Sequence, residues 1–211
     1  MNAWDQKFAA EGYLFGEGPN AFLARQAERL KPYGNALAIA DGEGRNGVWL
    51  AQQGLDVTSM DASSVGLAKA EALAASRGVT ITTQLVDIAA YPWPEDGFDV
   101  VVGIFFQFAP PALRDAIFAG MIKALRPGGL LLVEGYTPRQ LHHGTGGPKE
   151  LDHLYTADLL REKFAALEIV ELVEYEAELA EGARHVGMSA LVDLVAKKAE
   201  ITPGIDTPNQ K

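Results

Sequence analysis

Short apolar runs alternate along this chain with segments of helical periodicity. The apolar runs cover residues 36–40, 57–60, 79–86, 98–104 and 130–134. The segments between them place apolar residues on one helix face, as in 64–77 and 111–125. The run 98–104 is apolar except for one aspartate, which is typical of a strand covered on both faces. This alternation predicts a parallel sheet with helices on both faces.

The pattern changes near the C-terminus. After a helix that Thr156 is expected to cap, residues 168–176 and 188–196 both have the pattern of strands, and no helical segment separates them. Two strands joined by a loop pair antiparallel. We therefore expect an α/β fold, a three-layer Rossmann-like arrangement whose mostly parallel sheet ends in an antiparallel hairpin. Residues 1–200 are expected to form one domain, with an N-terminal helical segment at 1–34, a core at 35–200, and a loose tail at 201–211.

Polar and glycine residues follow the predicted strands where ligands of such sheets bind, at the carboxyl ends. The first strand leads into a glycine loop, in which a ligand can approach the backbone closely. Asp61 ends the second strand, about twenty residues later, where an acid can bind both hydroxyls of a ribose. These features predict a site for an adenosine-type cofactor. The loop sequence is Asp41-Gly42-Glu43-Gly44-Arg45-Asn46-Gly47.

Composition narrows the class of partner. The 211 residues carry a formal net charge of −10, which argues against nucleic acid as a partner. There is no cysteine, which excludes disulfides, thiolate metal sites and a cysteine nucleophile. No apolar stretch is long enough to span a bilayer, and the first residues lack the pattern of a signal peptide. We expect a soluble, cytoplasmic monomer or homodimer that acts on a small molecule, with no membrane partner.

Five motifs in order together resemble the class I S-adenosylmethionine-dependent methyltransferases: the glycine loop, Asp61, Asp87-Ile88, residues 98–101 and residues 125–129. The resemblance implies S-adenosylmethionine as cofactor and S-adenosylhomocysteine as product, with Asp61 on the ribose and Asp87 facing the adenine. One departure is that Ala38 and Ala40 stand where the family usually has an acid and a glycine, while an acid appears at Asp41. The implied cofactor residues are Ala40, Asp41, Gly42, Glu43, Gly44, Arg45, Asn46, Asp61, Ala62, Asp87, Ile88 and Phe105.

A narrower resemblance is to the tellurite-resistance-like and thiopurine-like small-molecule methyltransferases. It rests on residues 13–20, 42–46 and 181–187. In the family, the segment before the first strand folds over the cofactor as a lid. The resemblance does not fix the substrate, and the acceptor is expected to be a small molecule of a soft or anionic kind, such as an oxyanion or a thiol. Arg184 and His185, in the loop of the terminal hairpin, are the expected catalytic residues, through acceptor binding or proton removal. The expected substrate contacts are Tyr13, Phe15 and Phe106, and no metal site is expected.

Two alternatives remain open. Gly42, Gly44 and Gly47 satisfy G-x-G-x-x-G, which also occurs in NAD-dependent oxidoreductases. Against that reading stand the short chain, the expected terminal hairpin and the absence of a Tyr followed four residues later by Lys. The altered first motif also leaves open a protein that binds S-adenosylmethionine without catalysis.

Overall fold

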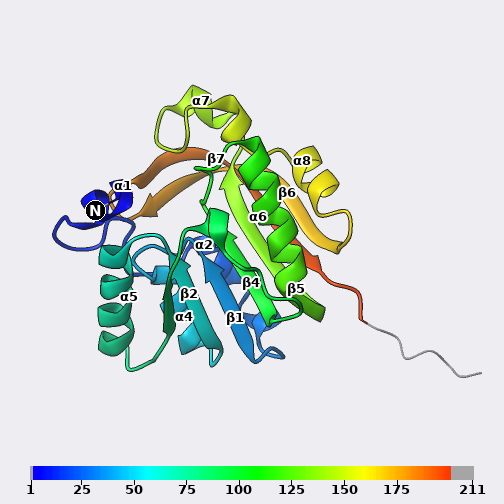
Figure 1. Cartoon of the computed structure of the whole chain (residues 1–211). Helices are drawn as coiled ribbons and strands as arrows, with labels where there is room; N and C mark the ends of the chain where they lie inside the picture. The colour runs from blue at the N-terminus through cyan, green and yellow to red at the C-terminus, as the bar shows by residue number, and fades with distance from the viewer. Residues whose placement is uncertain (1, 201–211) are drawn as a thin grey trace, which may run out of the picture.

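The computed structural model describes residues 2–200; Met1 and the predicted tail, 201–211, lie outside the described residues. A seven-stranded sheet, in the order β3-β2-β1-β4-β5-β7-β6, forms the centre (Figure 1). Strands β1 to β5 pair in parallel, and β7 is antiparallel to both β5 and β6. The predicted α/β fold with a terminal antiparallel hairpin is therefore confirmed. The strands are β1 Asn35–Ile39, β2 Asp56–Asp61, β3 Thr82–Leu85, β4 Phe98–Ile104, β5 Leu125–Tyr136, β6 Glu168–Glu181 and β7 His185–Lys197.

Helices cover both faces because successive side chains of each central strand point to opposite faces. Leu37 and Val101 pack with α6 and α8 on one face, whereas Ala38 and Val102 pack with α2, α3 and α4 on the other. The apolar runs of the sequence are thus buried on both sides. The helices are α1 Ala3–Phe8, α2 Ala21–Arg25, α3 Ala27–Leu30, α4 Arg45–Gln52, α5 Ser64–Ser76, α6 Pro111–Ala124, α7 Gln140–His143 and α8 Ala157–Lys163, with single 3-10 turns at η1 Ile88–Ala90 and η2 Leu151–His153.

The terminal hairpin is longer than the sequence pattern predicts. Pairing continues from Glu168↔Lys197 to Glu181↔His185, so that only residues 182–184 form the tip. Figure 1 shows the hairpin arching over the upper ends of the strands toward α1. Residues 177–187 escaped the prediction because half of them are polar or glycine, and pairing with the neighbouring strand holds them extended. The hairpin consequently forms a roof over the edge of the sheet where a ligand is expected.

Two other strand boundaries differ from expectation. Strand β3 covers only Thr82–Leu85 of the predicted 79–86. Strand β5 begins at Leu125, ahead of the predicted run 130–134, because Leu125 already pairs with Phe98 before a register shift. Thr156 caps α8 as predicted, by accepting the Leu159 N–H at 3.1 Å. Within residues 2–200, no helix is both long and apolar enough to cross a bilayer.

Candidate active site

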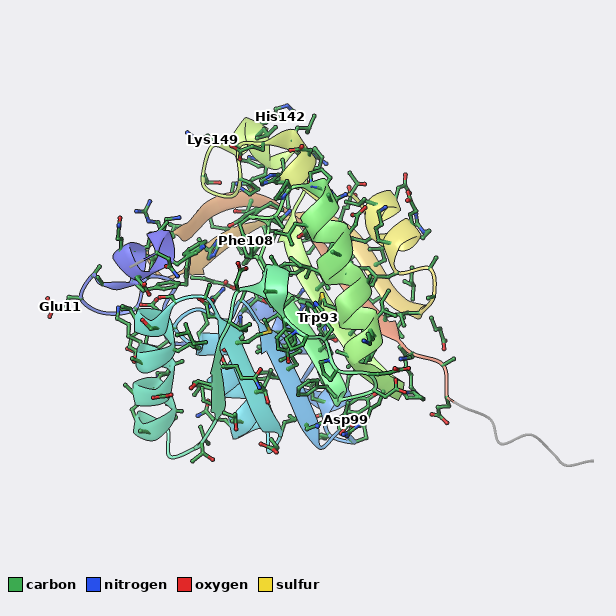
Figure 2. The ribbon with its side chains drawn as sticks, viewed as in Figure 1. Glu11, Trp93, Asp99, Phe108, His142 and Lys149 are labelled. Atoms are coloured by element: carbon green, nitrogen blue, oxygen red, sulfur yellow. The ribbon has the colours of Figure 1, made fainter. Side chains whose placement is uncertain are left out.

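A cavity of about 540 Å³ lies at the carboxyl ends of the parallel strands, below the hairpin. Figure 2 places Phe108 near the upper end of β4, beneath the arch, and Asp99 at the opposite end of the sheet. The lining comes from strand ends, the N-terminal segment and the tip of the hairpin. It consists of Asn2, Trp4, Phe8, Phe15, Ala40, Asp41, Gly42, Arg45, Asn46, Met60, Asp61, Ala62, Leu85, Val86, Asp87, Ile88, Ile104, Phe105, Phe106, Phe108 and His185.

Asp41 holds the glycine loop in shape. Its carboxylate accepts the Gly47 N–H at 3.1 Å and the Ser59 hydroxyl at 2.7 Å. Burial raises the pKa of Asp41 to about 7, and these two hydrogen bonds oppose the rise. Asp41 thus connects the start of α4 to β2. The loop is ordered although Ala38 supplies no acid.

Gly44 lets the loop lie directly on α5. Its φ is +85°, and a Cβ atom there would come within 2.4 Å of the Ala70 Cβ. Gly44→Ala is therefore expected to lower the free energy of unfolding by roughly 2–4 kcal/mol, through strain and overpacking. Urea denaturation measures the change. Gly78→Ala is the matched control, because Gly78 has φ +70° with nothing within 4 Å of its Cβ position; equal losses in the two variants would contradict the packing argument.

Two acids occupy the strand ends that the sequence singled out. The two oxygens of Asp61 accept the Gly42 N–H at 2.9 Å and the Ser63 N–H at 2.8 Å. Burial raises the pKa of Asp61, and these backbone hydrogen bonds oppose the rise. Each carboxylate oxygen keeps a further lone pair for a ligand hydroxyl. Asp87 is exposed, and one of its oxygens accepts the Ala89 N–H at 3.0 Å.

Stacked aromatic rings line the part of the cavity that lies opposite these acids. The His185 ring stacks on Phe105, with centroids 4.4 Å apart, and on Phe15 at 4.7 Å. Its Nδ1 lies 2.5 Å from the hydroxyl oxygen of Tyr136. Burial, together with the nearby Arg45 guanidinium, lowers the pKa of His185 to about 4. The imidazole is therefore neutral near pH 7.

The hairpin tip is joined to the glycine loop and to the N-terminal segment. Arg45 Nη1 lies 2.7 Å from Glu181 Oε2, and both side chains are at least nine-tenths buried. Glu181 also accepts the Ala21 N–H at 2.9 Å, at the start of α2. A Cβ atom on Gly182 would lie 2.3 Å from the backbone carbon of Phe15, so the two segments are in direct contact. These contacts hold the roof over the cavity.

Four of the predicted residues do not line the cavity. Glu43 pairs with Lys69 at 2.8 Å and accepts the Leu14 N–H at 2.6 Å, which ties the N-terminal segment to α5. The Tyr13 hydroxyl donates to the Lys69 carbonyl oxygen at 3.2 Å. Gly44 packs on α5, and Arg184 is exposed at the hairpin tip.

Phe106 lies at the border between cavity and core. It contributes to the lining but is only 1% exposed, and its ring packs against Phe118 and Tyr155.

The residues that the sequence analysis missed reach the site from distant elements. Trp4 and Phe8 on α1 line the cavity, whereas Tyr136 at the end of β5 and Glu181 on β6 contact the lining residues His185 and Arg45. Only Tyr136 carried a usable signal, because it follows an apolar strand.

A cluster of buried acids lies beside the cavity, between β5, β7 and the start of α2. Glu134 accepts a hydrogen bond from Asn20 Nδ2 at 2.5 Å and one from the Tyr175 hydroxyl at 3.1 Å. Asp193 pairs with Arg25 at 2.8 Å. Burial and the neighbouring Asp193 raise the pKa of Glu134 well above its ordinary value, and burial raises the pKa of Asp193 to about 6. Protonation of these two carboxyl groups therefore favours the folded state.

This cluster predicts a loss of stability as the pH rises from 5 to 8. A carboxyl group with a raised pKa in the folded state stabilises that state while protonated, and this contribution is lost as the pH rises through the folded pKa. Glu134→Gln keeps the shape without the charge, so we expect it to remove roughly 1–3 kcal/mol of the pH-dependent loss. Urea denaturation at pH 5.5 and 8 measures it. An unchanged pH dependence in the variant would contradict the prediction.

The comparisons with known proteins agree with this geometry. Residues 36–129 match the family described as a methyltransferase domain. An uncharacterized protein of Mycobacterium tuberculosis is 31% identical over 134 residues, which are 63% of this chain and 47% of the relative. A 2-heptyl-1-hydroxyquinolin-4(1H)-one methyltransferase of Mycobacteroides abscessus is 26% identical over 117 residues, 54% of this chain and 52% of the relative. The chain thus spans about half the length of these curated relatives.

Solved structures share the fold over most of the chain. A structure from work on the conversion of a disulfide into a thioacetal during echinomycin biosynthesis has a TM-score of 0.76 at 18% identity, covering 96% of this chain and 93% of the other. The structure of TehB from Haemophilus influenzae has a TM-score of 0.69 at 20% sequence identity, covering 92% of this chain and 65% of the other. The structure of the N-methyltransferase NodS from Bradyrhizobium japonicum WM9, in complex with S-adenosyl-L-homocysteine, has a TM-score of 0.70 at 17% sequence identity. The match covers 94% of this chain and 97% of the other. Residues 36–129 thus match the family described as a methyltransferase domain, and the chain shares the fold of these solved structures, among them the N-methyltransferase NodS.

Proposed function

We propose that this protein transfers a methyl group from S-adenosylmethionine to a small-molecule acceptor. The observation that carries the proposal is the bond between Asp61 and the Gly42 N–H, which fixes the acid against the glycine loop at the edge of the cavity. Asp87 lies at the next strand end along the sheet, where the adenine would be placed. The relatives named as methyltransferases support the same activity.

The residues at these strand ends fit the cofactor. Asp61 offers carboxylate lone pairs to two ribose hydroxyls, and the lining of three acids suits a cationic sulfonium. The cofactor would supply a methyl group bound to positive sulfur: the acceptor's lone pair forms the bond to the methyl carbon, and the electrons of the broken C–S bond stay on sulfur. The acceptor's proton, where it has one, passes to solvent or a base.

The protein contributes position and exclusion of water. Phe15 and Phe105 cover the half of the cavity below the hairpin, and the ion pair between Arg45 and Glu181 keeps the hairpin tip in place. His185 is the one predicted catalytic residue that reaches the cavity. With a pKa near 4, we assign it to binding the acceptor.

Calorimetric titration with S-adenosylhomocysteine, and in parallel with NADH, tests the proposal. We expect micromolar binding of S-adenosylhomocysteine and no saturable binding of NADH. The opposite pattern would favour the oxidoreductase alternative. Incubation with S-adenosylmethionine and candidate acceptors, followed by mass spectrometry of methylated products, then separates an enzyme from a protein that only binds the cofactor.

The narrower assignment to the tellurite-resistance-like branch stays a prediction. It rests on residues 13–20 and 181–187, and TehB supports it at the level of the fold. The oligomeric state also stays a prediction.

A further inference from the structure

We infer that the methyl acceptor is a neutral, planar ring compound that presents a hydrogen-bond-accepting oxygen or nitrogen to His185 Nε2. This inference rests on the proposed function, because it assigns the half of the cavity next to the cofactor. It replaces the oxyanion or thiol acceptor expected from the sequence.

The first step is the division of the cavity. The acids Asp41, Asp61 and Asp87 lie at or just beyond the carboxyl ends of β1, β2 and β3, which form one side of the sheet. Phe105 follows β4, and His185 begins β7, on the other side. Because the cofactor is assigned to the acidic side of the cavity, the aromatic side remains for the acceptor.

The second step is charge. Of the described residues that line the cavity, Arg45 is the only arginine or lysine, and its guanidinium is paired with Glu181 at 2.7 Å. Arg184, the other candidate for an anion, is exposed at the hairpin tip and does not line the cavity. His185 is neutral near pH 7. An anion would therefore enter a space bordered by carboxylates, with no free cation on the lining to compensate its charge.

The third step is shape. The acceptor side is lined by Phe15, Phe105 and Phe108. The His185 ring stacks on two of these rings, that of Phe15 in the N-terminal segment and that of Phe105 after β4. Phe105 adopts φ +53°, a conformation uncommon for a bulky residue. That backbone turn, fixed by the Phe105 N–H donating to the Glu134 carbonyl oxygen at 3.0 Å, brings the ring to the cavity. Aromatic faces favour stacking with a flat ring.

The fourth step is the hydrogen bond that the acceptor can make. The buried Tyr136 hydroxyl has His185 Nδ1 as its one hydrogen-bond partner among the described residues. Burial raises the pKa of Tyr136, so the phenol keeps its proton and donates it to Nδ1; the reverse arrangement would leave a buried O–H unpaired. A neutral imidazole that accepts at Nδ1 carries its hydrogen on Nε2. His185 therefore offers a donor, and Tyr136 is a positioning residue that fixes the tautomer.

The test uses protein saturated with S-adenosylhomocysteine and three probes. Chromone is neutral and planar with a ring carbonyl, chromone-2-carboxylate adds one negative charge to the same ring, and tellurite is an oxyanion. Calorimetry is expected to show saturable binding of chromone, at least about tenfold weaker binding of the carboxylate, and no binding of tellurite. Binding of tellurite or of the carboxylate in preference to chromone, or no chromone binding below millimolar concentration, would overturn the inference.

Variants test the assigned donor. His185→Phe keeps a stacking ring without nitrogen and is expected to weaken chromone binding about tenfold, while binding of S-adenosylhomocysteine changes less than about twofold. Tyr136→Phe should weaken chromone binding by a smaller factor; Tyr33→Phe, which removes a hydroxyl bonded to the Gly128 carbonyl oxygen far from the cavity, should leave it unchanged. If His185→Phe bound chromone with unaltered affinity, the assignment of His185 as the hydrogen-bond donor would be wrong. Failure of S-adenosylhomocysteine to bind the unmodified protein would instead refute the proposed function.

Discussion

Asp61→Ala is expected to weaken S-adenosylhomocysteine binding about a hundredfold or more. The substitution removes the acceptor for the ribose hydroxyls, and it also frees the Gly42 N–H and the Ser63 N–H, which the carboxylate holds at 2.9 and 2.8 Å. Charged hydrogen bonds contribute roughly 1.5–3 kcal/mol each, so losing two gives at least this factor. Calorimetric titration of the folded variant measures it.

Asp99→Ala is the matched control. Asp99 also accepts two backbone N–H groups, from Gly34 at 2.9 Å and from Asn35 at 3.1 Å, but it lies at the amino end of β4, opposite the cavity (Figure 2). We expect its variant to lose some stability and to keep the affinity for S-adenosylhomocysteine. If Asp61→Ala bound the ligand as tightly as Asp99→Ala, the proposed cofactor site would be wrong.

Arg45→Met is expected to lower the free energy of unfolding by roughly 3–5 kcal/mol. The guanidinium and Glu181 are both nearly buried, and removing one partner leaves a buried charge without compensation. Because Glu181 also receives the Ala21 N–H, the hairpin tip and the N-terminal segment should loosen together. Hydrogen exchange is expected to rise in residues 13–21 and 177–187, and urea denaturation measures the loss of stability.

Two further variants test this prediction. The double variant Arg45→Met with Glu181→Gln removes both charges and should recover part of the lost stability. Arg161→Met breaks an exposed pair with Asp158, for which we expect a change within about 0.5 kcal/mol. A similar small effect in Arg45→Met would mean that the ion pair does not hold the roof of the cavity.

Much of the fold was predictable because its information is local. The central strands β1 and β4 are buried on both faces, so their side chains are apolar in succession, and residues 36–39 and 98–104 were identified on that basis. The antiparallel end of the sheet followed from two strand patterns without a helix between them. The length of the hairpin was not predictable, because its last residues are held extended by pairing with each other.

The residues of the candidate site were likewise predictable in part. The acids at the strand ends were found from spacing alone, and Asp61 and Asp87 both line the cavity. Arg184 and His185 could not be distinguished, since both were expected in the hairpin loop. Only Arg184 lies in the turn, where it is exposed, whereas His185 is the first residue of β7 and lines the cavity.

The sequence by itself determined the order of strands and helices, the edge of the sheet where a ligand binds and the acids that line that edge, since each depends on the periodicity of a short segment. Only the tertiary structure decided which charges are free and which rings face the acceptor. The Arg45 guanidinium is neutralised by Glu181, and the His185 ring is oriented by Tyr136, through contacts between residues 136 and 49 positions apart in the chain. Such pairings depend on how the hairpin folds back over the sheet, and no local pattern in the chain records them.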